Sequence, residues 1–139
     1  LMQDLQKKLG MAIIMVTHDL GVIASMCDEI IVMYGGRVCE RGTADAIFYH
    51  PAHEYTKGLL RSIPKADNMN EKLIPIGGTP INLLQMPEGC AFCPRCESAM
   101  KFCLKQQPAE FRVGEDHLAS CWMNVKEIYE AQEGGSNEQ

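Results

Sequence analysis

The sequence lacks any long apolar run. Its longest runs, residues 11–16 and 30–34, are far shorter than the roughly 20 residues that a membrane-spanning helix requires, and no signal-peptide pattern opens the chain. Any association with a membrane would therefore have to come through a partner.

Positive charge is also scarce. Lys and Arg together number 13 against 18 Asp and Glu, which gives a formal net charge of -5 and a pI near 5.3, and no basic stripe is visible. Proteins that bind nucleic acid usually present such a stripe to the phosphate backbone, so no nucleic-acid partner is expected. Hydrophobic residues make up 46% of the chain, which is ordinary for a globular protein and excludes wholesale disorder.

The first residues indicate a chain that begins inside a larger unit. Leu1 is not an initiator Met, and apolar residues at positions 1, 2, 5 and 9 have helical spacing, with Gly10 as the expected C-cap. The apolar run Met11–Val16 follows and is typical of a parallel strand buried on both faces. Such a strand needs neighbouring strands and crossover helices, so we expect an N-terminal portion ahead of Leu1.

Three polar residues, Thr17, His18 and Asp19, stand at the carboxyl end of that predicted strand. Asp19 is a suitable N-cap for a short helix over Leu20–Met26. In open α/β sheets this rim is where ligands bind, which makes His18 a candidate functional residue. An isolated histidine is more often a structural hydrogen-bonding residue, and on the local pattern alone this alternative stays open.

A β-hairpin is predicted next. Strands over Glu29–Tyr34 and Arg37–Glu40 are joined by Gly35 and Gly36. Glycines accept the positive φ that a tight hairpin turn requires, so this link is a strong local signal.

Two helices follow the hairpin. Thr43 is the expected N-cap of a helix over Ala44–Tyr49, and a second helix is predicted over residues 53–63. His50 and His53 lie at the helix boundaries, where capping of backbone groups is more plausible than metal binding. Of the remaining segments, residues 65–72 are predicted to be a linker, 73–87 extended chain, 124–131 a helical stretch and 134–139 a disordered tail.

Cysteine is concentrated in one stretch. Of the seven cysteines, five fall close together, namely Cys90, Cys93, Cys96, Cys103 and Cys121. Disulfides do not persist in a reducing cytosol, so a metal or cluster site explains the stretch better. Its start imitates a bacterial ferredoxin run, but six residues rather than three precede the fourth cysteine. Spacing alone therefore leaves open which four bind. Cys27 and Cys39 are expected to be free thiols that pack as small hydrophobes.

Zinc is the main alternative to iron at such a site. Four thiolates suit tetrahedral zinc as well as iron, and spacing does not decide between them. Thiols without any metal are a further alternative. His117 could substitute as a ligand but is expected to be a solvated loop residue, as are the acidic residues Glu97, Glu110, Glu115 and Asp116.

The order of elements around His18 resembles the end of an ABC-transporter nucleotide-binding domain. The shared features are the apolar strand, Thr-His-Asp, a short helix, two strands around Gly35-Gly36, and Gly42-Thr43 opening a helix. The resemblance implies a P-loop (RecA-like) α/β fold. It also implies that His18 is the switch histidine, which hydrogen-bonds the γ-phosphate of ATP and helps to hold the attacking water. A neutral imidazole suits this role because it has one donor and one acceptor nitrogen.

Two further motifs are similar to the segment that follows the ATPase core in oligopeptide and dipeptide importers. One is the string His-Pro-x-His-x-Tyr-Thr-x-x-Leu-Leu over residues 50–60. The other is the spacing Cys90-x5-Cys96-x6-Cys103-x17-Cys121, with Pro-x-Gly-Cys-x-Phe-x-x-Arg-Cys at its start and Ser-Cys-Trp at its end. The resemblance implies a [4Fe-4S] cluster held by these four cysteines, in a structural or regulatory role. Cys93 departs from the usual family residue and could compete as a ligand.

Three motifs that this family uses for ATP are missing from the sequence. There is no G-x-x-x-x-G-K-[ST] loop to cradle the phosphates, no Leu-Ser-Gly-Gly-Gln signature and no strand-end Asp-Glu pair. ATP with Mg²⁺ is therefore expected as the cofactor of the full-length protein, and the chain alone is predicted to be inactive as an ATPase.

The sequence thus predicts an α/β fold in three parts. Residues 1–49 are expected to form the C-terminal end of an ABC ATPase domain, residues 50–123 a small loop-rich extension with the cysteine cluster, and residues 124–139 a short helix and tail. The expected function is that of part of the ATP-binding subunit of an importer of oligopeptides or dipeptides, peripheral at the cytoplasmic face of the cell membrane. Its expected partners are transmembrane subunits, a second ATP-binding subunit and, indirectly, a peptide-binding protein. A stand-alone zinc or iron-sulfur module, or an inactive truncation, is the alternative, and nothing in the sequence identifies the transported peptide.

Overall fold

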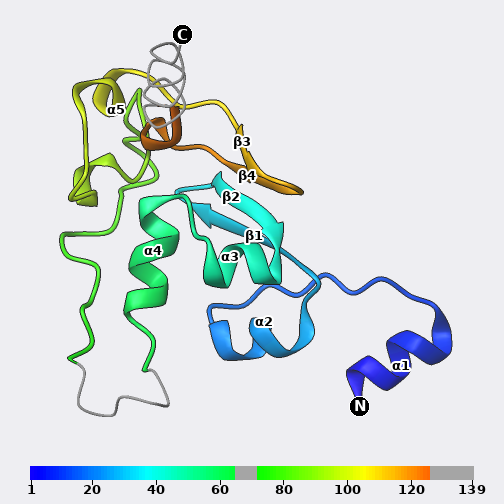
Figure 1. The fold of residues 1–139 in the computed structure, drawn as a ribbon. Helices are drawn as coiled ribbons and strands as arrows, with labels where there is room; N and C mark the ends of the chain where they lie inside the picture. Colours follow the sequence, from blue (N-terminus) through cyan, green and yellow to red (C-terminus); the bar gives the residue numbers. More distant parts are fainter. Residues whose placement is uncertain (65–71, 126–139) are drawn as a thin grey trace, which may run out of the picture.

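The computed structural model describes residues 1–64 and 72–125 and shows a mixed α/β fold (Figure 1). Its centre is a four-stranded antiparallel sheet in the order β1-β2-β4-β3. Helices α3 and α4 contact the β1–β2 hairpin. In chain order the elements are α1 (Met2–Leu9), α2 (Leu20–Met26), β1 (Glu29–Tyr34), β2 (Arg37–Thr43), α3 (Ala44–Tyr49), α4 (Glu54–Arg61), the 3-10 turn η1 (Cys93–Arg95), α5 (Lys101–Lys105), β3 (Phe111–Gly114) and β4 (His117–Ala119).

The predicted β1–β2 hairpin is confirmed. Gly35 and Gly36 have φ of 57° and 75°, so both central residues of the turn take the left-handed conformation that glycine adopts most readily. Burial alternates along β1, with Ile30, Val32 and Tyr34 facing the core. Strand β2 runs three residues beyond the predicted end, to Thr43.

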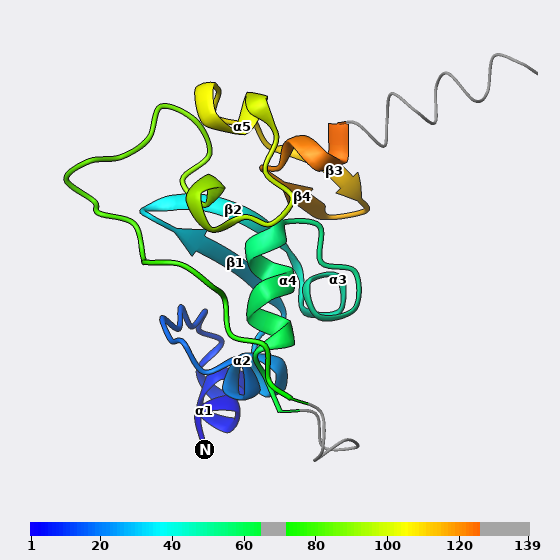
Figure 2. The same cartoon turned by 90° about the vertical axis from the view of Figure 1, so that its left-hand side faces the viewer.

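A second hairpin, β3–β4, joins this sheet and was not predicted. Strand β4 pairs with β2 through Glu40 opposite Ala119 and Gly42 opposite His117. Strand β3 pairs in turn with β4, with Phe111 opposite Ala119. Segments more than 70 residues apart in the chain therefore lie side by side (Figures 1 and 2).

The helix caps follow the sequence closely. Thr43 Oγ1 accepts a hydrogen bond from the backbone N–H of Ala46 at 3.2 Å, and His53 Nδ1 accepts one from Tyr55 at 3.0 Å. Asp19 caps α2 through the N–H groups of residues 21 and 22. These side chains satisfy backbone donors that a helix N-terminus leaves free.

Two small apolar clusters stabilise the sheet. One contains Ile30, Val32 and Ile47, with Cys27 packed against it. The other contains Tyr34, Cys39, Ala91 and Phe92. Cys27 and Cys39 therefore pack as small hydrophobes, as predicted.

Residues 72–92 form no helix or strand, as predicted, and run along α4 (Figure 2). The Arg95 guanidinium holds this segment by donating to the backbone oxygens of Ile76 at 3.0 Å and Gly77 at 2.8 Å. Tyr34 Oη accepts a further hydrogen bond from the N–H of Ile81 at 3.3 Å. The segment is thus tied both to the sheet and to the cysteine-bearing loop.

The buried parallel strand predicted over Met11–Val16 is wrong for this chain. These residues have no regular secondary structure, and Ile14 and Val16 are 94% and 96% exposed. A parallel strand is stable only beside neighbours that satisfy its backbone groups, and no strand in residues 1–64 and 72–125 pairs with this segment. The preceding helix α1 ends at Gly10 as predicted, but it buries no residue and lies apart from the sheet (Figure 1).

The predictions for the linker and for the C-terminal end fall mostly outside the described residues. Of the linker only Lys72 is described. Of the helix predicted over residues 124–131 only the first two residues are described, and they are helical, as are residues 122 and 123. Within the described part of the chain, no helix has the length and apolar character needed to cross a membrane.

Candidate metal centre

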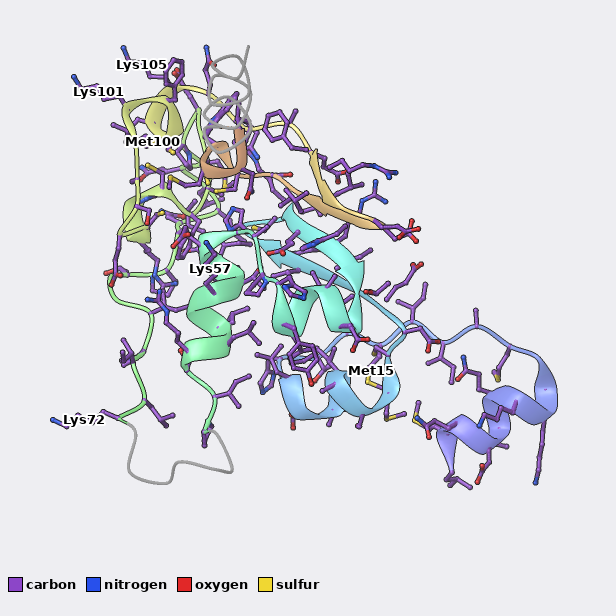
Figure 3. The ribbon with its side chains drawn as sticks, in the orientation of Figure 1. Met15, Lys57, Lys72, Met100, Lys101 and Lys105 are labelled. Carbon is purple, nitrogen blue, oxygen red and sulfur yellow. The ribbon has the colours of Figure 1, made fainter. Side chains whose placement is uncertain are left out.

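Five cysteine side chains line one small cavity beneath α5, where sulfur atoms gather in Figure 3. Apolar side chains of Phe92, Trp122 and Met123 also line the cavity. The cysteines are those of the predicted cluster, Cys90, Cys93, Cys96, Cys103 and Cys121. The structure therefore brings together residues that extend over 32 positions of the chain.

A glycine allows the first two cysteine-bearing segments to meet. The N–H of Cys90 donates to the carbonyl of Cys103 at 2.8 Å, which fixes the loop against α5. A Cβ atom on Gly89 would lie 2.1 Å from the same carbonyl oxygen, far inside van der Waals contact. Only glycine fits at position 89, so this residue determines the approach of Cys90 to Cys103.

Cys121 reaches the cavity through the β3–β4 hairpin. It lies two residues after the end of β4, and the N–H of the intervening Ser120 donates to the carbonyl of Cys39 in β2 at 2.8 Å. Trp122 then donates from Nε1 to the carbonyl of Gln106 at 2.9 Å. The sheet and the Trp122 contact thus place the last cysteine beside the others.

Backbone N–H groups point at four of the five sulfur atoms. Cys103 Sγ accepts from the N–H of Met100 at 3.4 Å. Backbone N–H groups likewise lower the pKa of three other thiols, with Phe92 and Cys93 donating to Cys90, Ser98 to Cys96, and Met123 and Glu54 to Cys121. For Cys93, burial and neighbouring thiols are the causes of its pKa shift, and no backbone donor contributes. Such N–H groups stabilise a sulfur that carries negative charge.

Burial raises the pKa of four of these thiols, Cys90, Cys93, Cys96 and Cys121, and so keeps them protonated in the metal-free chain. Desolvation is the largest cause of the raised pKa at Cys90, Cys93 and Cys121, and it raises the pKa of Cys96 to about 12. A metal ion binds the deprotonated thiolate, so binding here would release protons. The cavity therefore suits a cation, which would compensate the charge that burial disfavours.

The donor chemistry of the cavity fits a thiophilic metal, but the side chains are not yet arranged around one. Within residues 1–64 and 72–125, no three His, Cys, Asp or Glu side chains are placed to hold a metal ion together. The enclosed volume is about 10 Å³, close to the space of one water molecule. Any metal would thus need the thiols to turn toward it, and a four-iron cluster would need them to move farther apart than a single ion.

His117 corrects a prediction, because it is buried and not a solvated loop residue. Its Nε2 lies 2.6 Å from Glu40 Oε1, and the two side chains are 4% and 0% exposed. Glu40 also accepts from the N–H groups of Ala52 at 2.7 Å and His53 at 2.9 Å. This network joins β2, β4 and the start of α4, and it was missed because the β4 strand was not predicted. The predicted exposure of Glu97, Glu110, Glu115 and Asp116 is confirmed.

His53 is a helix cap, as predicted, and it also lines the cysteine cavity. Burial lowers its pKa to about 4, against the smaller opposing effects of Glu40 and Glu54. The imidazole is therefore neutral at pH 7, which leaves Nδ1 free to accept the N–H of Tyr55. His50 is the C-cap residue of α3.

The structure does not bring His18 to the cysteine cavity. His18 is exposed and directly precedes Asp19, whose N–H donates to Thr17 Oγ1 at 3.0 Å. Within the described ranges, the two predicted sites are thus separate, and the role of His18 stays a prediction.

Comparisons with known proteins cover most of the chain. Residues 39–103 match the family model described as the oligopeptide/dipeptide transporter C-terminal region. The chain is 45% identical over 129 residues to the oligopeptide transport ATP-binding protein OppD of Haemophilus influenzae, covering 92% of the chain and 39% of that protein. It is 47% identical over 124 residues to OppD of Bacillus subtilis, covering 88% of the chain and 35% of that protein. The dipeptide transport ATP-binding protein DppD of Bacillus subtilis is 42% identical over 123 residues, with 88% and 37% covered.

The chain spans little more than a third of the length of these curated relatives. The matched part includes the cysteine loop up to Cys103 in the family model and most of the chain in each relative. Residues 39–103 thus match the C-terminal region of oligopeptide/dipeptide transporters, and most of the chain is similar to ATP-binding proteins of oligopeptide and dipeptide transport.

Proposed function

We propose that the chain is part of the ATP-binding subunit of an ABC importer for oligopeptides or dipeptides. The relatives named above are ATP-binding proteins of oligopeptide and dipeptide transport, and their similarity covers most of the chain. In the whole protein, ATP hydrolysis would be coupled to peptide uptake through transmembrane subunits and a second ATP-binding subunit. The protein would be peripheral at the cytoplasmic face of the membrane.

His18 is the residue of this chain that would contact ATP. Its place after an apolar stretch and before a capped helix resembles that of the switch histidine, and a neutral imidazole can contact a phosphate oxygen while it orients a water. The phosphate-binding loop and the Mg²⁺ ligands would come from other parts of the full-length protein. The chain by itself would not hydrolyse ATP.

The cysteine cavity would hold a metal centre on Cys90, Cys96, Cys103 and Cys121. One observation supports this set: these four thiols line one cavity and each accepts a backbone N–H. Their electrostatic contacts link Cys90 to Cys103, Cys103 to Cys96, Cys96 to Cys121 and Cys121 to Cys90. Each of the four thiols therefore interacts with two others of the set, although they would have to turn toward a bound metal.

A [4Fe-4S] cluster on these cysteines would supply one-electron chemistry or, more simply, stability. The protein groups would hold the four thiolates, donate N–H hydrogen bonds to them and exclude water with Phe92 and Trp122. The loop over residues 72–96 has no helix or strand before η1, so metal-binding energy would contribute directly to its folding. A structural role follows most simply from this geometry.

A single zinc ion is the second candidate occupant. Four thiolates suit tetrahedral zinc, and the cavity of about 10 Å³ is nearer in size to one ion than to a four-iron cluster. Zinc would keep the structural role and exclude a redox one.

Anaerobic purification of the chain, followed by absorption spectroscopy and metal analysis, tests the centre. A cluster gives broad absorbance near about 400 nm and about four irons per chain. Zinc gives about one ion per chain without this absorbance. Either metal should be lost in Cys96→Ser and kept in Cys27→Ser, since Cys27 lies in the other apolar cluster. Absence of metal from the parent chain would contradict the proposed centre.

The ATPase proposal is tested separately in the full-length protein that contains this chain. His18→Ala should abolish ATP hydrolysis while ATP binding persists, because the imidazole acts on the γ-phosphate and the attacking water. Glu29→Ala, an exposed position on β1, serves as the control. Undiminished hydrolysis in His18→Ala would refute the proposed role. A stand-alone metal module would instead show no ATPase activity in any form.

A further inference from the structure

Cys93 is a fifth thiol at a site that needs four. It lines the same cavity as the four proposed ligands and is only 6% exposed. A tetrahedral metal ion takes four ligands, and a [4Fe-4S] cluster is likewise held by four cysteines. Cys93 is therefore surplus to the proposed set, although it is buried among its members.

Cys93 has two thiol neighbours in the cavity, Cys90 and Cys103. Its N–H donates to the carbonyl of Cys90 at 3.0 Å, so the two residues share one turn. After burial, the neighbouring thiols of Cys103 and Cys90 are the causes that raise its pKa. The corresponding thiol neighbours of Cys96 are Cys121 and Cys103. Cys103 is thus a neighbour of both thiols, whereas Cys90 acts on Cys93 and Cys121 acts on Cys96. The backbone does not separate Cys93 from Cys96, because the N–H of Cys96 donates to the carbonyl of Cys93 at 3.2 Å.

We propose that Cys93 is a reserve ligand that can replace Cys90 in the metal centre. The second ligand set would be Cys93, Cys96, Cys103 and Cys121. This inference rests on the proposed metal centre, and it concerns only which thiols complete it. Cys93 is suited to this exchange because it shares a turn with Cys90 and lies beside the common neighbour Cys103.

Cys90 remains the preferred ligand of the two. Its sulfur accepts the N–H groups of Phe92 and Cys93, whereas no backbone donor is among the groups that act on the Cys93 sulfur. Replacing Cys90 by Cys93 gives up these hydrogen bonds. Loss of such outer contacts typically weakens metal binding by about 10- to 100-fold. The exchanged set should therefore bind metal, but more weakly.

Cys39 is the other thiol near Cys90 and provides a matched control. It interacts electrostatically with Cys90 and Cys121, but it packs with Tyr34 and Phe92 and does not line the cavity. If any nearby thiol could replace Cys90 as a ligand, Cys39 would do so as well as Cys93. If a position in the cavity is required, only Cys93 can replace Cys90.

Anaerobic titration of the metal-free chain with Co²⁺ tests the inference, because thiolate-bound Co²⁺ absorbs visible light and reports both stoichiometry and affinity. Cys90→Ser should still bind one Co²⁺ about 10- to 100-fold more weakly than the parent. The double variant Cys90→Ser/Cys93→Ala should bind no Co²⁺, whereas Cys90→Ser/Cys39→Ala should bind it as Cys90→Ser does. Cys96→Ser should lose binding even with Cys93 present, because the thiols that act on Cys93 are Cys103 and Cys90 and do not include Cys96.

Two results would overturn the inference. One is loss of Co²⁺ binding in both Cys90→Ser and Cys90→Ala while far-UV circular dichroism matches the metal-free parent. The other is a Cys90→Ser/Cys93→Ala double variant that binds Co²⁺ as tightly as Cys90→Ser alone. A parent chain that binds no Co²⁺ and also holds neither iron nor zinc after anaerobic purification would remove the proposed metal centre itself, and the inference with it. The two proposals therefore fail in distinguishable ways.

Discussion

Residues 1–28 and residues 29–125 use their apolar side chains in opposite ways. Both parts contain an apolar run that predicts a strand, but Val16 in the first run is 96% exposed, whereas Val32 in the second is 8% exposed. Strand β1 finds its partner β2 across a two-residue turn, while the run at Met11–Val16 has no partner strand in the described part of the chain. Composition therefore predicts a capacity for burial, and an available neighbour determines whether burial occurs.

Helix capping does not show this difference. Gly10 ends α1 with φ of 61°, and Asp19 caps α2, although neither helix buries a residue. Thr43 caps α3 in the same manner within the well-packed part. A cap needs only neighbouring backbone groups, so it forms in both parts alike.

The largest effect should come from breaking the close contact at Gly89. In Gly89→Ala the new Cβ would meet the Cys103 carbonyl at 2.1 Å, so the cysteine loop must separate from α5. We expect a loss of at least about 3 kcal/mol in the free energy of urea unfolding, and loss of metal binding. Gly77→Ala is the control because a Cβ there meets open space. Similar stability of the two variants would contradict the role given to Gly89.

The next largest effect should come from the buried pair between β2 and β4. His117→Ala would leave the Glu40 carboxylate buried without its side-chain partner, and we expect a loss of about 3 kcal/mol in urea unfolding. Glu110→Ala removes the exposed contact to Arg41 that joins the same part of the sheet. An exposed ion pair contributes less than about 1 kcal/mol, so this control should change the free energy of unfolding very little. Equal losses would mean that burial does not decide the strength of this pair.

A smaller effect should appear when the pH is lowered. Burial lowers the pKa of His53 to about 4 in the folded chain. In the unfolded chain the imidazole takes up a proton near pH 6.5, so between these pH values the unfolded chain binds one proton more than the folded chain. The contribution of His53 to stability is therefore complete above pH 6.5 and is lost as the pH falls toward 4. Between pH 7 and pH 5 the loss should be roughly 2 kcal/mol, measured by urea unfolding of the metal-free chain.

His53→Asn separates this effect from other titrations. Asparagine keeps a side-chain oxygen that can cap α4, but it does not titrate. The pH dependence between 7 and 5 should flatten by roughly the amount assigned to His53. An unchanged slope would show that His53 is not the responsible group.

Elements stabilised by local chemistry were predicted from the sequence, and elements that depend on distant pairing were not. The Gly35-Gly36 hairpin and the caps at Asp19 and Thr43 are encoded within a few residues. Strands β3 and β4 have only four and three residues, and β4 is held by β2 from more than 70 positions away. His117 was therefore assigned to solvent, although β4 places it against Glu40.

The cysteine site shows the same division. Spacing and resemblance predicted the cluster, and the structure places all five thiols around one cavity. Spacing could not show that backbone N–H groups favour four sulfurs over Cys93, or that Gly89 must lack a side chain. Those features arise from folding of the loop against α5 and β4. They depend on contacts that no local pattern contains.

The smallest effect should come from the exposed apolar run, and it sharpens the comparison between the two parts. Val16→Ser changes a side chain that is 96% exposed, so the free energy of unfolding of this chain should change by less than about 0.5 kcal/mol. Val32→Ser, at a buried position of β1, should cost about 2 kcal/mol or more. In the full-length protein, where the proposed ATPase core would supply the missing strands, Val16→Ser should become as costly as Val32→Ser. If Val16→Ser did not lower the free energy of unfolding of the full-length protein either, the run at Met11–Val16 would be a strand neither in this chain nor in the full-length protein. The placement of His18 at a strand end would then lose its basis.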